Sequence, residues 1–374
     1  MSTEALQQID AAMQRHIEAG KIQGAVTAVA RRGRVVHFQA HGLIDVEAER
    51  PMPEDAIFVM ASSTKAVLGV AAMILIDEGL IHPDDPVEKY IPEFADMQVA
   101  VLAEPTDKDI SPLKVDRRNP PPHRLVPAKT PIKIRHLLTH TSGLVSGGLG
   151  TRLKPGANRA TLASYIPTLG DFALDFHPGS HWSYGGALQV VARIIEVVSG
   201  MSYEEFMQTR VFDPLDMRDT HFRVPPSKLP RRVVIRGVDM SKWDGEATSR
   251  GLWSTARDYL RFQQMLANGG EISGRRVLSP DAVATMASNH VGDLFGRGPK
   301  GMKGMGFGYT VSVVLDPEAA GSPRGAGAFG WGGAAGTVSW TDPTEEIAGV
   351  IMLQQPYMPA RRDFENTIRQ AIID

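Results

Sequence analysis

A serine and a lysine three residues apart, at the start of a long apolar segment, could supply a nucleophile and its base. Ser62 and Lys65 lie in segment 60–79, whose residues after Lys65 are mostly apolar. Side chains three residues apart share one face of a helix, so the hydroxyl and the amine can meet. Backbone N–H groups of a first helical turn favour negative charge, and desolvation favours a neutral, basic lysine. The pattern therefore predicts a Ser-x-x-Lys nucleophile.

The motif also has a plain structural interpretation, in which Ser62 caps a helix and Lys65 lies at the surface. A second copy, from Ser111 to Lys114, shows how readily the spacing arises by chance. That copy lies among prolines and cannot open a helix, so we set it aside. The helix predicted after Lys65 is apolar on nearly all sides, which is typical of a helix buried in a core.

Two further segments contain residue types that fit such a site. Tyr184 lies in segment 177–186, after a Pro-Gly turn and beside glycines. It could be a core tyrosine with a satisfied hydroxyl, or a phenolic base or proton relay next to a lysine. Segment 328–336 is a glycine-rich strand edge, and its N–H groups could face a substrate carbonyl. A bulge at a sheet edge is the alternative for that segment.

Several other motifs fail in context, and we predict no metal and no cofactor. The G-x-G-x-x-G match at 296–301 contains a proline and does not lead into a helix. His136 and His140 are four residues apart, but Leu137 stands where a zinc protease needs glutamate, so packed or capping histidines are the better interpretation. There is no Gly-x-Ser-x-Gly and no cysteine, which excludes disulfides and thiolate sites.

Composition indicates an ordinary globular protein. The chain has 374 residues, 43% hydrophobic and 22% charged, with a formal net charge of −2. Nothing in this balance suggests a nucleic-acid partner. The N-terminus lacks the pattern of a secretory signal, and the apolar run 66–76 is too short to span a bilayer. We expect a cytoplasmic protein that binds a small molecule and no membrane, with its oligomeric state left open.

Strand patterns lie at both ends of the chain and helical patterns in the middle. Strands are predicted at 24–30, 34–38, 306–314, 335–340 and 347–353, and helices at 4–19, 66–76, 133–140, 186–199, 202–212, 255–268 and 360–373. This segregation favours an α+β fold in which the two ends form one antiparallel sheet and the helical middle is an inserted lobe. The proline-rich connection 104–131 is long for a plain loop, and we expect a flap or a mobile excursion there.

Taken together, these stretches and their order resemble the serine β-lactamase and penicillin-binding-protein superfamily. The nearest branch resembles class C β-lactamases and, more specifically, family VIII carboxylesterases. Besides Ser62, Lys65 and Tyr184, the resemblance rests on the segments Ile-Arg-His-Leu-Leu-Thr-His-Thr-Ser-Gly-Leu (134–144), Phe-Asp-Pro-Leu-Asp-Met (212–217) and Gly-Leu-Trp-Ser-Thr-Ala-Arg-Asp-Tyr (251–259).

The resemblance implies a role for each residue. Ser62 would be the acyl-forming nucleophile, and Lys65 and Tyr184 the coupled base that takes its proton and later activates water. The third motif, Lys-Thr-Gly in β-lactamases, aligns with Trp331-Gly332-Gly333, a substrate-binding segment. The backbone N–H groups of Ser62 and Ala334 would form the oxyanion hole, worth roughly 3 kcal/mol per donor in comparable hydrolases.

The resemblance also implies two domains with the active site between them. Residues 1–66 and 260–374 would form an α/β domain whose antiparallel sheet is flanked by the terminal helices, and residues 67–259 a mostly helical domain. Pocket walls are expected from segments 104–131 and 290–305.

One departure from the class C pattern bears on the substrate. The Tyr-x-Asn motif of those enzymes reads Tyr184-Gly185-Gly186 here, so Gly186 offers no amide to a β-lactam side chain. We therefore expect a carboxylesterase that cleaves small carboxylic esters through an acyl-enzyme. A β-lactamase, a D-amino-acid peptidase or an acyltransferase of the same mechanism, and a non-catalytic binding relative, are the alternatives.

Overall fold

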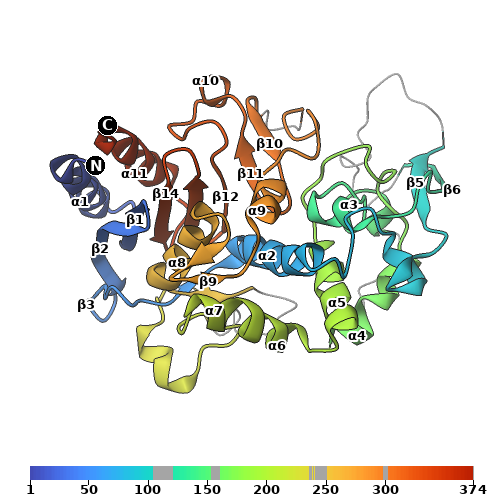
Figure 1. Cartoon of the computed structure of the whole chain (residues 1–374), viewed down its shortest axis with the longest axis horizontal. Helices are drawn as coiled ribbons and strands as arrows, with labels where there is room; N and C mark the ends of the chain where they lie inside the picture. The colour runs from blue at the N-terminus through green and yellow to red at the C-terminus, as the bar shows by residue number, and fades with distance from the viewer. Residues whose placement is uncertain are drawn as a thin grey trace.

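An antiparallel sheet of eight strands is built from both ends of the chain (Figure 1). The computed structural model describes residues 1–103, 121–152, 161–235, 238, 240, 251–297 and 302–373. In sheet order the strands are β10 (Met305–Phe307), β11 (Ser312–Val314), β12 (Phe329–Gly332), β13 (Thr337–Asp342), β14 (Ile347–Leu353), β1 (Gly24–Arg31), β2 (Arg34–Asp45) and β3 (Arg50–Pro51). The two ends meet where β1 pairs with β14, with Ala25 opposite Leu353.

Helices from the two termini lie side by side on one face of the sheet (Figure 1). They are α1 (Thr3–Glu18) and α11 (Met358–Ala371), and the Ser2 N–H donates to the Ala371 carbonyl at 2.8 Å. Their apolar side chains share a buried cluster with alternate residues of β1, such as Ala25 and Val29. The other alternate residues, such as Val26 and Ala28, join the main core, to which α8 (Ala256–Ala267) also contributes. The predicted α+β fold with terminal helices is therefore confirmed.

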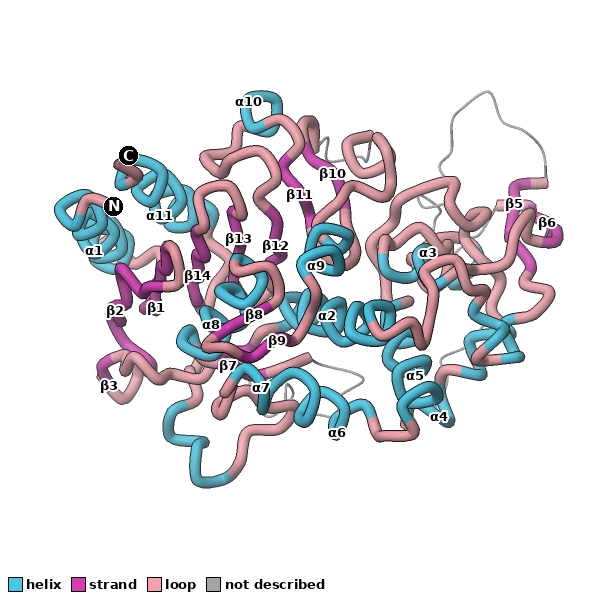
Figure 2. The backbone as a smooth tube through the Cα atoms, in the orientation of Figure 1, coloured by secondary structure: helices cyan, strands magenta, loops and turns pink. Residues whose placement is uncertain are grey.

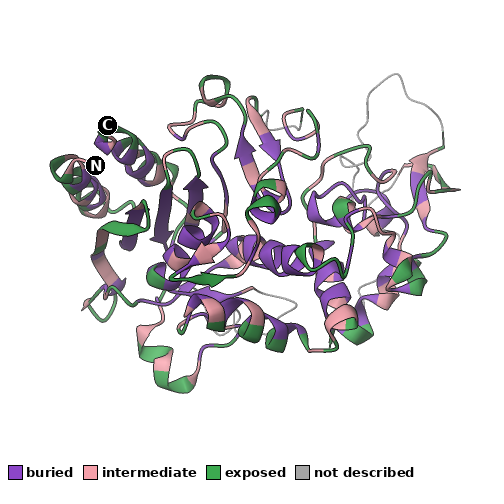
Figure 3. Ribbon diagram, in the orientation of Figure 1, coloured by how far each residue is buried: buried purple, intermediate pink, exposed green. Residues whose placement is uncertain are grey.

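The predicted central helix is buried along most of its length. It is α2 (Thr64–Asp77), and its residues from Ala66 to Leu75 are all buried, as the purple ribbon in Figure 3 shows. It contacts α5 (Leu188–Ser199) and α9 (Pro280–Met286). Gly69 allows the closest approach, because a Cβ there would lie 2.0 Å from the Thr310 hydroxyl. Because α2 is packed on all sides, its N-terminus is a rigid support for residues 62–65.

Short helices and small sheets make up the rest of the described structure (Figure 2). The helices are α3 (Ile134–Leu138), α4 (Leu162–Tyr165), α6 (Tyr203–Met207), α7 (Asp213–Leu215) and α10 (Pro317–Ala320), with a π-helical turn at Gln208–Phe212. The turns of 3₁₀ helix are Ala61–Ser63, Val87–Lys89, Pro92–Phe94, Gly150–Arg152, Pro167–Asp171 and Pro226–Arg231. Strand pairs are formed by β4 (Phe58–Val59) with β7 (Trp253–Ser254), β5 (Gln98–Leu102) with β6 (His123–Pro127), and β8 (Glu271–Ile272) with β9 (Arg275–Arg276). None of the helices in the described ranges has the length and apolar character needed to cross a membrane.

The prediction of one strand over 306–314 is wrong. The segment forms a hairpin of β10 and β11, in which Phe307 pairs with Ser312. Thr310 adopts a left-handed backbone with φ of 67°, and the Gly308 N–H donates to the Val311 carbonyl at 2.8 Å. The sequence pattern shows no sign of this turn, because its residues are themselves buried: Thr310 lies against Gly69 of α2, and the Tyr309 N–H donates to the Met286 carbonyl of α9 at 2.9 Å.

Other boundaries shift for local reasons. The strand predicted at 34–38 continues to Asp45, and the helix predicted at 133–140 ends at Leu138, because His140 adopts a left-handed backbone with φ of 58°. The glycine-rich β12 lies inside the sheet between β11 and β13, so the interpretation as a sheet edge is wrong. Of the proline-rich connection, 104–120 lies outside the described residues. The two-domain division stays a prediction, and its boundary at 259/260 falls within α8.

Candidate active site

The serine and lysine of the Ser-x-x-Lys motif are in contact. Lys65 Nζ donates a hydrogen bond to Ser62 Oγ at 3.3 Å, and both residues are partly exposed. Ser62, predicted in the first helical turn, lies instead in the 3₁₀ turn Ala61–Ser63 that leads directly into α2. Ala61 has φ of 45°, a left-handed conformation that costs a non-glycine residue on the order of 1–3 kcal/mol. The surrounding contacts must therefore hold this turn in place.

Segment 251–259 provides those contacts on one side of the turn. The Met60 N–H donates to the Leu252 carbonyl at 2.8 Å, and the Leu252 N–H donates to the Thr64 hydroxyl at 2.8 Å. The buried Tyr259 hydroxyl donates to the Ser63 carbonyl at 2.7 Å. Segment 251–259 therefore holds the backbone of the serine turn in place.

The ends of β12 and β13 hold the turn on its other side. Thr337 Oγ1 donates to the Met60 carbonyl at 3.2 Å and lies 3.0 Å from Ser63 Oγ. Gly333 is required here, because a Cβ would lie 2.2 Å from the Met60 carbonyl oxygen. Ala334, the next residue, is exposed. The segment around Ala334 therefore packs against the segment that precedes Ser62. The assignment of the Ser62 and Ala334 N–H groups as an oxyanion hole stays a prediction.

Tyr184 and Trp331 complete a group of four neighbouring side chains. Lys65 Nζ lies 5.0 Å from the centroid of the Tyr184 ring, within the range of a cation–π contact. Trp331 Nε1 donates to the Tyr184 hydroxyl at 3.4 Å, and the two ring centroids are 5.6 Å apart. Tyr184 is 38% exposed, so part of this residue is open to a ligand. The structure therefore brings together residues from three distant parts of the sequence that we predicted to act together.

The loop of Tyr184 is fixed by close backbone contacts. The Ser183 N–H donates to the His140 carbonyl at 2.9 Å, and the Gly186 N–H donates to the Val145 carbonyl at 3.3 Å. A Cβ at Gly185 would lie 2.4 Å from the Val145 carbonyl oxygen, so only glycine fits there. A Cβ at Gly186 would meet Val145 at an ordinary 3.6 Å. The missing side chain at Gly186 is therefore not forced by packing.

His140 is a site neighbour whose position was not foreseen. Its ring centroid lies 4.7 Å from that of Tyr184, and within the described residues both ring nitrogens lack hydrogen-bond partners. Burial, together with the charge of Lys65, lowers the pKa of His140 to about 3, so the ring is neutral at neutral pH. The expected packed histidine is confirmed. His136 accepts the Lys133 N–H at 3.2 Å, as a capping residue would.

Aromatic side chains extend the site beyond Tyr184. Trp182 packs edge-on against Phe295 and Phe307, with centroids 4.7 and 5.4 Å apart. Phe307 in turn meets Trp331 edge-on at 5.3 Å. Phe295 comes from segment 290–305, which we expected to supply a wall of the pocket. Tyr184 and Trp331 therefore rest on a buried aromatic cluster, and the Lys65 amine is in contact with the serine.

The chain combines an antiparallel sheet flanked by terminal helices with a serine–lysine pair at the start of a buried helix. These features are those of serine hydrolases and acyltransferases with a β-lactamase fold. The Beta-lactamase family model matches residues 9–372, and the chain belongs to this family.

Three comparisons illustrate the range of relatives. The chain is 34% identical over 366 residues to the uncharacterized protein MT1414 of Mycobacterium tuberculosis, covering 90% of this chain and 87% of the relative. It is 29% identical over 411 residues to esterase EstB of Burkholderia gladioli, covering 97% and 94% of the two chains. The solved structure of EstCE1, described as a hydrolase with promiscuous acyltransferase activity, superposes with a TM-score of 0.78 at 25% identity, covering 99% and 98%.

Proposed function

We propose that the protein is a carboxylesterase that cleaves small carboxylic esters through an acyl-enzyme on Ser62. The observation that carries the proposal is the 3.3 Å hydrogen bond between Lys65 Nζ and Ser62 Oγ, which pairs a nucleophile with a base. The similarity to the esterase EstB supports ester substrates. The mechanism needs no metal or cofactor.

The chemistry divides into acylation and deacylation. In acylation, Ser62 Oγ bonds to the ester carbonyl carbon while its proton passes to Lys65 in the neutral form. The carbon–oxygen bond to the alcohol then breaks, and the Lys65–Tyr184 pair returns a proton to the leaving oxygen. In deacylation, water attacks the acyl carbon, gives its proton to the same pair and releases the acid, and Ser62 recovers its proton. The N–H groups of Ser62 and Ala334 would stabilise the oxyanion in both steps.

Esters are favoured over β-lactams by two positions. Trp331 stands where β-lactamases carry the lysine of Lys-Thr-Gly, and an indole donates one neutral hydrogen bond but supplies no charge. Hydrogen bonds to charged groups are roughly twice as strong as neutral ones, so a substrate carboxylate would bind weakly here. Gly186 removes the amide partner of the β-lactam side chain. An ester needs neither contact.

Acyl transfer to an alcohol or amine instead of water is the second candidate. It is favoured by the similarity to EstCE1, whose description includes promiscuous acyltransferase activity. The acyl-enzyme on Ser62 would be common to both reactions, so the acceptor alone distinguishes them. β-Lactamase and D-amino-acid peptidase activities share the same first step. Location in the cytoplasm stays a prediction.

A fluorophosphonate probe followed by intact-mass analysis tests the nucleophile. Wild type should gain one phosphonyl group, and Ser62→Ala should gain none and lose esterase activity while remaining folded. Ser111→Ala is the matched control, because it removes the serine of the second Ser-x-x-Lys copy and should label like wild type. Labelling of Ser62→Ala, or activity within tenfold of wild type, would overturn the assignment. Product analysis with ester alone and with added alcohol then separates hydrolysis from acyl transfer.

A further inference from the structure

Three side chains of types that can ligate a metal converge between α1 and the β1–β2 hairpin. This place shares no residue with the candidate active site. Asp10 lies on α1, and His37 and His41 lie on β2. Asp10 Oδ1 is 3.9 Å from His37 Nε2 and 3.8 Å from His41 Nε2. The three ligand atoms all lie within 4.8 Å of one another. We call this group the α1–β2 cluster.

Strand register explains why these groups meet. Thr27 of β1 pairs with Gln39 of β2, so Thr27 shares a sheet face with the residues two positions to either side of Gln39, which are His37 and His41. That face is the one covered by α1, whose residue Ile9 is fully buried in the cluster beneath it. Asp10 follows Ile9 on the helix and extends toward the two imidazoles.

The hydrogen bonds of His37 and His41 with Thr27 leave one oxygen of the Asp10 carboxylate without a hydrogen-bond donor in the described part of the chain. Thr27 Oγ1 lies 2.8 Å from His37 Nε2 and 2.9 Å from His41 Nε2, so one hydroxyl can donate to one ring and accept from the other. Asp10 Oδ1 is buried and has no hydrogen-bond partner in the described part of the chain. Separations of 3.8–3.9 Å are too long for hydrogen bonds. A buried carboxylate oxygen without a donor is costly, and a cation between it and the imidazoles would remove that cost.

The geometry fits a small divalent cation with nitrogen and oxygen ligands. Bond lengths of about 2.0–2.2 Å in a tetrahedral zinc site place neighbouring ligand atoms roughly 3.3–3.6 Å apart. The observed separations between Asp10 and the histidines exceed this by only a few tenths of an ångström. The histidine side chains are 8% and 6% exposed, so burial protects the site, while the half-exposed Asp10 provides an entry path.

We propose that Asp10, His37 and His41 bind one divalent transition-metal ion, for which Zn²⁺ is the best chemical match. Two imidazoles and one carboxylate suit zinc, and the Thr27 hydroxyl or a water would occupy the fourth position. The ion would join α1 to the hairpin that begins the sheet. Its function would therefore be structural, stabilising the N-terminal helix without taking part in ester cleavage.

Calorimetric titration of the chelator-treated full chain with ZnCl₂ tests the proposal, with visible absorption of the Co²⁺ form as a second readout. We expect one ion per chain, a Tm that rises with Zn²⁺ concentration, and the intense bands of tetrahedral Co²⁺. Asp10→Ala and His41→Gln should each weaken Zn²⁺ binding by more than roughly tenfold. Mutation of residues that only hydrogen-bond to metal ligands already lowers metal affinity by about that much, so loss of a ligand should cost more. Esterase activity of the metal-free variants should remain at the wild-type level, which also reports that they are folded.

His16→Gln is the matched control. His16 also belongs to α1, and its Nε2 lies 2.9 Å from Asp363 Oδ2, so it forms a second histidine–carboxylate pair outside the α1–β2 cluster. This variant should bind Zn²⁺ like wild type. Absence of saturable one-to-one binding would overturn the proposal. The Asp10→Ala variant should fold, because Asp10 is at a half-exposed helix position. If its affinity for Zn²⁺ equalled that of wild type, binding would be adventitious and the proposal would also be overturned.

Discussion

The indole nitrogen of Trp331 lies 3.4 Å from the hydroxyl oxygen of Tyr184, while Lys65 Nζ faces the ring of that tyrosine at 5.0 Å from its centroid. A neutral donor thus contacts the phenol, and the Lys65 amine that contacts Ser62 lies against the ring face. Under the proposed function, this arrangement would place the proton-transfer group beside the aromatic faces of Tyr184 and Trp331, which would suit an uncharged ester better than an anionic lactam.

The first prediction concerns substrate choice. Wild-type kcat/KM should be far higher for nitrophenyl butyrate than for nitrocefin, because an indole cannot supply the charge that a β-lactam carboxylate needs. Trp331→Lys should lower ester turnover more than it raises nitrocefin turnover, since the hydrogen bond to Tyr184 is lost and Gly186 remains. Steady-state kinetics with both substrates decide the matter. Equal or better turnover of nitrocefin by wild type would replace the esterase proposal with a β-lactamase.

The second prediction concerns the coupling of Lys65 and Tyr184. Each of Lys65→Ala and Tyr184→Phe should lower kcat by roughly 10²- to 10⁴-fold, the usual contribution of general acid–base catalysis. The double variant should be little worse than either, because groups that act as one proton-transfer unit are not additive. Burst kinetics and kcat over pH 5–9 provide the measurement. Losses that add in log kcat, or a flat pH profile, would contradict a coupled pair.

The third prediction compares two adjacent glycines. Gly185→Ala should destabilise the fold by about 1–3 kcal/mol, as overpacking does, because its Cβ would lie 2.4 Å from the Val145 carbonyl oxygen. It should also lower activity by displacing Tyr184. Gly186→Ala should change stability by less than about 0.5 kcal/mol, since its Cβ has room. Urea unfolding of both variants is the measurement, and equal effects would refute the contact at Gly185.

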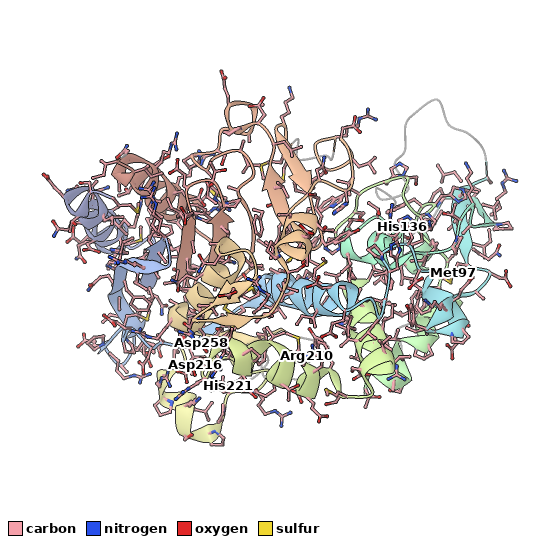
Figure 4. All side chains as sticks on the ribbon, in the orientation of Figure 1. Met97, His136, Arg210, Asp216, His221 and Asp258 are labelled. Carbon is pink, nitrogen blue, oxygen red and sulfur yellow. The ribbon has the colours of Figure 1, made fainter. Side chains whose placement is uncertain are left out.

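The fourth prediction concerns pH and Asp258, which Figure 4 labels near His221. Burial raises the pKa of Asp258 to about 6, although the Asp219 N–H and the Thr220 hydroxyl donate to its carboxylate. The folded protein therefore binds the Asp258 proton more tightly than the unfolded chain does. This contribution to stability is fully present below the ordinary carboxyl pKa near 4, and it is lost as the pH rises through 6.

The Asp258→Asn variant tests the direction in which stability changes with pH. The amide resembles the protonated acid and keeps an oxygen for both donors, so the variant should match wild type at pH 4. At pH 8 it should be more stable by up to about 2–3 kcal/mol, the free energy that such a pKa shift implies. Urea unfolding at both pH values measures the difference. A variant equally destabilised at pH 4 and pH 8 would contradict the raised pKa.

The sequence alone determined the parts of this protein that depend on local pattern. Three-residue spacing placed Ser62 and Lys65 on one helix face, and an unbroken apolar run predicted that α2 would be buried. Segregated strand and helix patterns predicted an antiparallel sheet made by the two chain ends, which in the structure meet where β1 pairs with β14. These features follow because burial imposes a period of two on strands and of 3.6 on helices, which the sequence records directly.

Only the tertiary structure decided which distant residues meet and where the backbone departs from regular conformations. The left-handed backbone of Ala61 and the turn at Thr310 are held by neighbouring segments, so no local pattern announces them. The contact of Trp331 with Tyr184 depends on strand β12 meeting the loop of Tyr184. The α1–β2 cluster depends on the register of β1 with β2 and on the placement of α1 above them. Periodicity reports which face of an element is buried, whereas the partner across that face is set by long-range packing.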